Sequence, residues 1–221
     1  MSDKNGRHVT GWVKTLADSP WVEPILGALV AVFGIATAGA AYQASIYGGN
    51  SSENFFVAQS ALTDTNFFYN QADSIAQKDF DILTEIEVQT ALEAPDDAIT
   101  ALVNALSEDA LASFERSNDL DEEYYNGLYA VAEEYESTAT KAFAAAREWD
   151  ALGDDYELLG LILAVGLGFA GWAGLLDRES VVRYAFAALA VVALALSIYM
   201  TVNLVSRPIP PMFTPPTSDT E

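Results

Sequence analysis

The chain has 221 residues, of which 51% are hydrophobic, and it carries a formal net charge of −22. Apolar and acidic residues in such numbers rarely share one uniform globular domain, so we expect them in different regions. The acidity argues against nucleic acid as a partner, because a phosphate backbone binds a basic face. There is no cysteine and the only histidine is His8, so zinc centres, catalytic cysteines and histidine triads lack candidate residues. We therefore predict no catalytic residue, no cofactor, no metal site and no enzyme activity.

The chain is predicted to begin with a cytoplasmic tail, residues 1–20, followed by a first transmembrane helix over residues 21–45. The apolar run from Trp21 reaches the ~20 residues that a helix needs to cross the hydrocarbon. Its backbone must be helical there, because lipid offers no hydrogen bonds. The triplet Ala38-Gly39-Ala40 resembles a signal-peptide cleavage site, but the length of the run favours an uncleaved anchor.

Small residues form a stripe along the first span at alternating steps of four and three, and a shorter stripe recurs in the second span. Such stripes let helix backbones approach closely in lipid, where little hydrophobic force drives association. We predict that they pack against another span or another copy of the chain. The stripes consist of Gly27, Ala31, Gly34, Ala38, Ala41 and Ser45, and of Gly160, Ala164 and Gly168.

The first span is expected to leave the membrane through the segment AYQASIYGGNSS, which begins at residue 41. The Gly48-Gly49 pair is predicted to break or kink the helix, so that Ser51 or Ser52 caps a new one. Asn50 opens a possible glycosylation sequon. Aromatic side chains near the span ends suit the head-group layer, where the ring meets lipid and the polar tip meets water. The predicted interface residues are Trp21, Tyr42, Gln43 and Tyr47.

Residues 46–157 are predicted to form an acidic, helical, soluble domain. This segment holds 25 Asp or Glu residues and four Lys or Arg residues, a net charge of −21. A carboxylate-rich surface keeps a protein soluble in strong salt, so the composition is typical of halophilic proteins.

Two arms of this domain, residues 52–79 and 121–150, carry apolar residues at helical spacing. They are predicted to pair as an antiparallel hairpin, and the second arm is expected to run on into the second span. The apolar positions are Phe55, Phe56, Ala58, Leu62, Phe67, Phe68, Ala72 and Ile75 in the first arm, and Leu128, Val131, Tyr135, Thr138, Ala142, Ala145 or Ala146, and Trp149 in the second.

Between the arms, two or three short helices are predicted. Pro95 follows a helix end, and Asp96-Asp97 or Ser107 is placed to cap the next helix. The predicted core of this tip consists of Leu83, Ile86, Leu92, Ile99, Leu102, Val103, Leu106, Leu111 and Phe114.

Two features of the acidic domain allow either a ligand site or a structural role. Residues 118–123 cluster carboxylates, but they lack the glycine and glutamate positions of a calcium loop, so an acid-rich helix N-terminus is favoured. The aromatic run at residues 66–71, with Tyr124, Tyr125 and Tyr129, is suited to line a groove between the arms. A hydrophobic core is the favoured interpretation of that run.

A second transmembrane helix over residues 158–176 and a third over residues 182–205 are predicted on either side of a short loop, residues 177–181. The proline-rich tail, residues 206–221, is predicted to be extended or disordered. No acid or base is expected to be buried in the spans, which argues against an ion-coupled transporter.

The orientation is predicted from positive charges near the span ends, which favour the cytoplasm. The tail carries Lys4, Arg7 and Lys14, and the loop region carries Arg178 and Arg183, while Arg207 is a single dissenting charge. Three spans place the tail and the loop on the same side, so both are predicted to be cytoplasmic and the acidic domain extracytoplasmic.

Three short motifs resemble a family of uncharacterised three-span prokaryotic membrane proteins with a helical domain between spans one and two. The motifs are Tyr42-Gln43 at the end of a span, Tyr47-Gly48-Gly49 after it, and Asp155-Tyr156-Glu157-Leu158 at the entry to the second span. Residues 80–120 depart from the family pattern. The resemblance implies three spans and an uncleaved first helix, and it brings no known activity from which catalytic residues could be inferred.

The predicted fold is therefore all-α, with three transmembrane helices and an acidic helical-hairpin domain inserted between the first and the second. We expect a multi-pass cell-membrane protein in contact with lipid and with copies of itself or another membrane protein. The predicted function is non-enzymatic: an interaction, sensing or scaffolding subunit. The alternative is a homo-oligomeric channel or a transporter accessory subunit.

Overall fold

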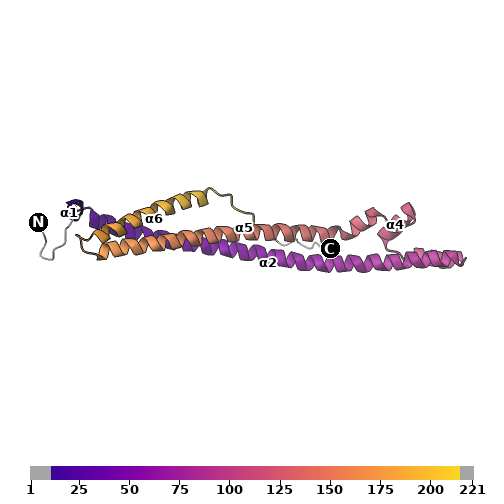
Figure 1. Ribbon diagram of the computed structural model, residues 1–221. Helices are drawn as coiled ribbons and strands as arrows, with labels where there is room; N and C mark the ends of the chain where they lie inside the picture. The colour runs from indigo at the N-terminus through magenta and orange to yellow at the C-terminus, as the bar shows by residue number, and fades with distance from the viewer. Residues whose placement is uncertain (1–10, 215–221) are drawn as a thin grey trace. The chain divides into compact units, whose positions relative to one another are not determined.

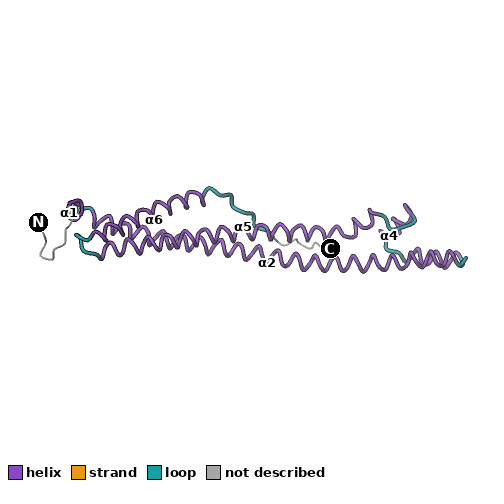
Figure 2. Tube along the Cα trace, viewed as in Figure 1, coloured by secondary structure: helices purple, strands orange, loops and turns teal. Residues whose placement is uncertain are grey.

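The computed structural model describes residues 11–214, except for the side chains of Trp12, Lys14 and Leu16. Every regular element in this part of the chain is a helix, as predicted (Figures 1 and 2). The described residues form two compact units: residues 11–52 with 145–211, and residues 53–144 with 212–214, called unit 1 and unit 2 below. The helices are α1 (Gly11–Ala17), α2 (Val22–Ala91), α3 (Asp96–Val103), α4 (Glu108–Ser117), α5 (Glu122–Leu175) and α6 (Val181–Val205).

Three helices, α2, α5 and α6, each contain a stretch that is long and apolar enough to cross a membrane. Helix α6 corresponds closely to the predicted third span, and α5 ends at Leu175, one residue before the predicted end of the second. The prediction that the second arm runs on into the second span is confirmed, because α5 continues without a break.

The predicted helix break at Gly48-Gly49 is wrong, because α2 is continuous through both glycines. Neither nearby serine caps a new helix. The Ser51 hydroxyl is buried and donates a 3.0 Å hydrogen bond to the carbonyl of Ala146, and Ser52 donates one of 2.9 Å to the carbonyl of Gly48. Two glycines cost a helix only about 2 kcal/mol relative to alanine, which contacts with a neighbouring helix readily offset.

The core of unit 1 lies where the first part of α2, the last part of α5, and α6 meet. Phe33 is fully buried, and its ring fills the space that Gly166 leaves because it has no side chain. A Cβ atom at Gly166 would lie 2.5 Å from Cζ of Phe33 and 3.1 Å from Cβ of Ala193. Gly166 is therefore the glycine that permits close packing here, and no predicted stripe includes it. The buried members of this core are Phe33, Ala40, Ala44, Tyr156, Leu159, Leu163, Ala170, Ala190, Ala193 and Leu204.

The predicted small-residue stripe of the first span faces away from this core. All six of its residues are exposed within the chain, and a Cβ atom at Gly27 or Gly34 would meet nothing within 4 Å. In the second span, Gly160 lies close to Ala40: a Cβ atom placed on Gly160 would be 3.8 Å from the Cβ atom of Ala40. The other two residues of this stripe, Ala164 and Gly168, are exposed. Packing of the first stripe against another span of the same chain is thus absent among the described residues. Packing against another copy remains a prediction.

In unit 2, α2 and α5 pair in antiparallel fashion, as predicted: Tyr69 bonds Glu136, and further along α2 Asp73 bonds Tyr129. The buried positions repeat every three or four residues on both helices, and most are small, which brings the helices close together. They include Ala58, Ala61, Thr65 and Ala72 on α2, and Ala132, Tyr135, Ala139 and Ala142 on α5. The predicted apolar stripe was partly out of register, because Phe56, Leu62, Phe67 and Val131 are exposed.

The tip of unit 2 is built by α3, α4 and the ends of α2 and α5. Eight of the nine predicted core residues are buried or partly buried together, whereas Leu92 is 70% exposed. Ser107 caps α4 as predicted, since its hydroxyl accepts a hydrogen bond from the Ala110 amide. Leu92 misses the core because α2 ends at Ala91 and the chain turns there.

The described beginning of the proline-rich tail, residues 207–214, contains no helix or strand, which agrees with the extended alternative of the prediction, and it is held by specific contacts. In unit 2, the Phe213 amide donates a 3.0 Å hydrogen bond to Oδ1 of Asn54, which is fully buried, and the Phe213 ring packs against the cluster around Val57, Ala58 and Ala142. In unit 1, the Trp149 indole donates to the Pro211 carbonyl. Residues 215–221 lie outside the described residues.

Candidate functional site

Unit 2 buries one carboxylate almost completely, that of Asp79, which is 1% exposed. It accepts hydrogen bonds from the Ser107 amide (2.9 Å), the Ser107 hydroxyl (2.5 Å) and the Tyr124 hydroxyl (2.9 Å). These bonds join α2, the start of α4 and the start of α5 at one point. A buried carboxylate is retained only when donors satisfy it, so Asp79 is the group that fixes the tip.

Sequence reasoning missed Asp79, although a signal was present. Asp79 lies seven residues after Ala72. In a closely packed helix pair, residues seven apart lie on the same face, so Asp79 shares the face of Ala72. A carboxylate at a core position of an amphipathic helix predicts a buried polar network.

Two further tyrosines link α2 to α5 through carboxylates. Tyr69 donates a 2.8 Å hydrogen bond to Glu136, and Tyr129 donates one of 2.6 Å to Asp73. The bond to Asp73 raises the pKa of Tyr129 to about 12, and the bond to Glu136 raises that of Tyr69. Burial is the main cause of the raised pKa of Tyr124, and its bond to Asp79 adds to it.

The aromatic residues suited to a groove lining belong mainly to the contact between the two helices. Phe68 packs on Tyr135, with ring centroids 5.1 Å apart, and Tyr69 lies beside Tyr129. Phe67 is 62% exposed, and Tyr125 is partly exposed beside Tyr124. The core interpretation is therefore confirmed for Phe68 and Tyr124 and is wrong for Phe67.

We expect the stability of the full chain to fall as the pH rises above about 10. Unfolded tyrosines lose their protons near pH 10, whereas Tyr69, Tyr124 and Tyr129 keep theirs to higher pH in the folded state. The folded state then binds more protons than the unfolded state, so stability declines with pH. Thermal unfolding between pH 8 and 11.5 tests this, and Tyr129→Phe is expected to reduce the decline. A midpoint that stays constant or rises between pH 10 and 11 would contradict the expectation.

The acidic cluster at residues 118–123 forms a helix start, as favoured from the sequence. Asp121 accepts a hydrogen bond from the Tyr124 amide in the first turn of α5, and Arg116 holds it through two further bonds of 2.9 and 3.0 Å. These donors, the guanidinium first, hold the pKa of Asp121 far below its usual range. Asn118 ends α4 in the left-handed conformation. Among residues 11–214, no three or more metal-binding side chains come together.

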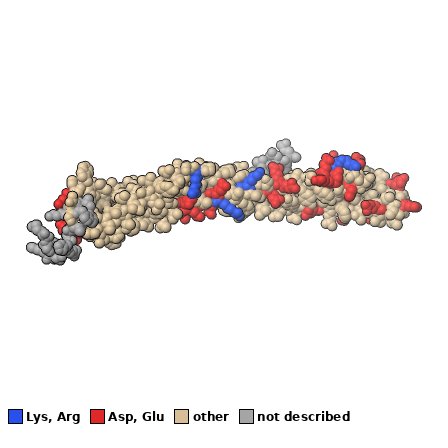
Figure 3. Space-filling view, turned by 45° about the horizontal axis from the view of Figure 1, so that its top comes forward, with Lys and Arg blue, Asp and Glu red and all other residues tan. Residues whose placement is uncertain are grey.

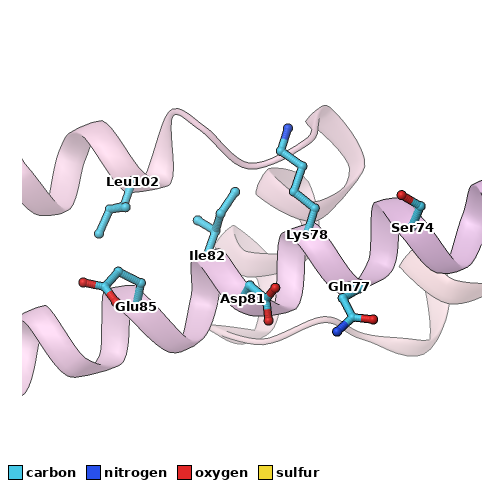
Figure 4. Close-up of a pocket in the computed structure, with 7 residues that line it drawn as sticks. All are labelled: Ser74, Gln77, Lys78, Asp81, Ile82, Glu85 and Leu102. Atoms are coloured by element: carbon cyan, nitrogen blue, oxygen red, sulfur yellow. The ribbon is translucent and has the colours of Figure 1, made fainter.

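A shallow groove of about 480 Å³ lies between α2 and α3 in unit 2 (Figure 4). Leu102 of α3 and Ile82 of α2 both extend into the space between the two helices, while Lys78 extends its amine away from α2. The remaining lining residues are Ser74, Gln77, Asp81 and Glu85. The groove presents one cation and two carboxylates, and it is open to solvent.

Unit 1 contains a buried cation that the sequence did not predict. Arg183, in the first turn of α6, is 2% exposed and donates a 2.6 Å hydrogen bond to Glu23 of α2. Arg178 approaches the same carboxylate oxygen at 3.1 Å. The prediction that no acid or base is buried in the spans is therefore wrong for Arg183. Its charge can be buried because Glu23, at the start of the first span, compensates it.

These ion pairs neutralise some of the positive charges from which the orientation in the membrane was predicted. Glu23 offsets part of the positive charge of Arg178 and Arg183, and Arg207, the dissenting cation, is paired with Asp155. Lys4 and Arg7 lie outside the described residues, as does the side chain of Lys14. The orientation therefore rests on fewer unpaired charges than the sequence suggests.

The predicted interface residues fall into two groups. Trp21 and Tyr42 are exposed, at 71% and 66%, as residues that meet head groups would be. Tyr47 instead stacks within unit 1, its ring centroid 5.5 Å from that of Trp149 and 5.1 Å from that of Tyr156. Gln43 is partly buried, and Asn50 lies inside the continuous helix α2. Its glycosylation stays a prediction.

On the face seen in Figure 3, Asp and Glu side chains gather over the helices of unit 2, and the surface over the apolar part of unit 1 is almost free of charge. The chain thus separates acidic and apolar residues, as its composition predicts.

Comparison with known proteins returns no match among protein-family models, curated proteins or solved structures. The resemblance to three-span prokaryotic proteins remains a hypothesis.

Proposed function

We propose that the chain is a three-span integral membrane subunit that acts through interaction, sensing or scaffolding, with no enzymatic step. Residues 46–157 form its acidic helical domain, which lies outside the cell and meets a partner there. The tail and the loop near residues 177–181 are cytoplasmic. Lipid surrounds the spans, and the subunit assembles with copies of itself or with another membrane protein.

The observation that carries this proposal is the continuity of two helices. Helix α2 runs from its apolar stretch into the acidic segment without a break, and α5 runs from the acidic segment into its apolar stretch. A change imposed on either helix by a partner therefore has a direct covalent and hydrogen-bonded route to a span.

The use of the carboxylates in unit 2 supports a structural rather than a catalytic role. Asp73, Asp79 and Glu136 each accept a hydrogen bond from a tyrosine on the opposing helix, and Asp121 caps α5. These groups hold the helix pair together. The abundance of carboxylates elsewhere is consistent with life in strong salt.

The competing function is a homo-oligomeric channel or a transporter accessory subunit. It is favoured by the outward small-residue stripe of the first span, which leaves that helix free to meet other copies. Ion flux across liposomes that contain only the purified protein distinguishes the two functions. We expect flux no greater than in empty liposomes. Flux that scales with protein content would overturn the scaffolding function and establish the channel.

A further inference from the structure

Part of α2 in unit 2 has a face that no other described residue covers. Between residues 56 and 74, α2 packs against α5 on one side (Figure 1), through Ala58, Ala61 and Ala72. The opposite side is exposed, with Phe56 at 70% and Phe67 at 62%. We call this side the α2 outer face. It consists of Phe56, Thr63, Phe67, Asn70 and Ser74, which follow one another at steps of seven, four, three and four.

Charge is nearly absent from this face, in a domain that is otherwise strongly acidic. Among the exposed and half-buried residues of α2 from Phe56 to Gln77, two carry a charge: Asp64, which is half-buried, and Asp73, which accepts a hydrogen bond from Tyr129. Neither belongs to the α2 outer face. The exposed residues of α5 from Glu122 to Glu148 include six glutamates. Two large phenylalanine rings on an uncharged face indicate a contact surface, because a solvated face of this domain would carry carboxylates.

We propose that a second copy of this chain covers the α2 outer face. The proposal deepens the proposed function, on which it rests for the membrane setting. Two copies of a domain with a net charge of −21 repel each other wherever carboxylates would face carboxylates. Two copies that meet through the α2 outer face avoid this repulsion, because the residues of that face carry no carboxylates.

The membrane fixes the geometry of such a pair. Copies inserted in the same direction carry α2 in the same direction, so the two helices run parallel about a two-fold axis along the membrane normal. Each residue of the outer face then meets its own symmetry mate, and spacings of three, four and seven match a parallel helix pair. In unit 1, α2 separately exposes the uncovered glycines Gly27 and Gly34, which tolerate a close parallel neighbour.

The missing cysteines allow a direct test. Thr63→Cys places one thiol at the centre of the α2 outer face, and Thr140→Cys places one on the exposed side of α5. The full chain is oxidised in its native membrane at about 1 M salt, where the Debye length is about 3 Å. We expect a disulfide-linked dimer with Thr63→Cys, formed at least tenfold faster than with Thr140→Cys.

A second pair of variants separates a specific contact from random collision. Phe67→Glu, added to Thr63→Cys, brings like charges together at the two-fold axis and is expected to lower the cross-linking rate about tenfold. Phe80→Glu alters an aromatic residue that is 59% exposed but lies off this face, and it is expected to leave the rate unchanged. Both sites are exposed, so the fold is retained, which far-UV circular dichroism checks.

Equal rates for Thr63→Cys and Thr140→Cys, no effect of Phe67→Glu, or an adduct to a different protein would each overturn the second copy as occupant. None of these outcomes bears on the orientation of the domain or on ion flux. Failure of this inference is therefore distinguishable from failure of the proposed function.

Discussion

Replacing Gly166 with alanine is expected to lower the stability of unit 1 by about 1–3 kcal/mol, the usual cost of overpacking a filled core. The new Cβ atom would lie 2.5 Å from Cζ of Phe33 and 3.1 Å from Cβ of Ala193. Phe33 is fully buried, so its ring has little room to move. The measurement is thermal unfolding of the full chain in detergent, followed by near-UV circular dichroism.

Gly168→Ala is the matched control, because a Cβ atom at Gly168 would meet nothing within 4 Å. It is expected to leave stability unchanged or to raise it by about 1 kcal/mol, the ordinary gain of alanine over glycine in a helix. Adding Phe33→Leu to Gly166→Ala is expected to recover part of the loss. If the two alanine variants unfold alike, the close contact of Phe33 with Gly166 is not what holds this core.

Replacing Asp79 with alanine is expected to destabilise the tip of unit 2 by several kcal/mol. The substitution leaves the Ser107 amide and the Tyr124 hydroxyl without their acceptor in a buried site. Each buried donor left unsatisfied costs about 1–3 kcal/mol. Hydrogen exchange of α4 in the full chain measures the effect, and we expect exchange to accelerate at least tenfold.

Asp81→Ala provides the control, since Asp81 is an exposed carboxylate two residues along the same helix. It is expected to leave exchange in α4 unchanged. Ser107→Ala should fall between the two, because it removes the α4 cap, worth about 1 kcal/mol, yet keeps the amide bond to Asp79. Slow exchange retained in Asp79→Ala would refute the role of this carboxylate in fixing the tip.

Hydrophobic periodicity predicted the helices, the three candidate spans and most of the tip core, because these depend on local composition. It placed the register of the first arm less well. The large residues Phe56 and Phe67 suggested a buried face, whereas the close pairing of α2 and α5 selects small residues such as Ala61 and Ala72 for the contact.

The errors at specific positions have a common physical origin. Gly48-Gly49 lowers local helix propensity, but contacts such as the bond from Ser51 to Ala146 depend on a helix distant in sequence. Gly166 and Asp79 matter through what lies opposite them, Phe33 and Ser107 respectively. A single chain's pattern does not specify such partners, since propensity is a weak prior that tertiary contacts override.

The central claim is that a three-span anchor presents the acidic helical domain outside the cell. It is tested by introducing single cysteines, Ala98→Cys on the exposed side of α3 and Glu179→Cys in the loop between α5 and α6. Intact cells are then treated with a membrane-impermeant maleimide, and lysed cells serve as the labelling control. Labelling of Ala98→Cys alone in intact cells is the predicted result. Labelling of Glu179→Cys alone would invert the orientation and contradict the account.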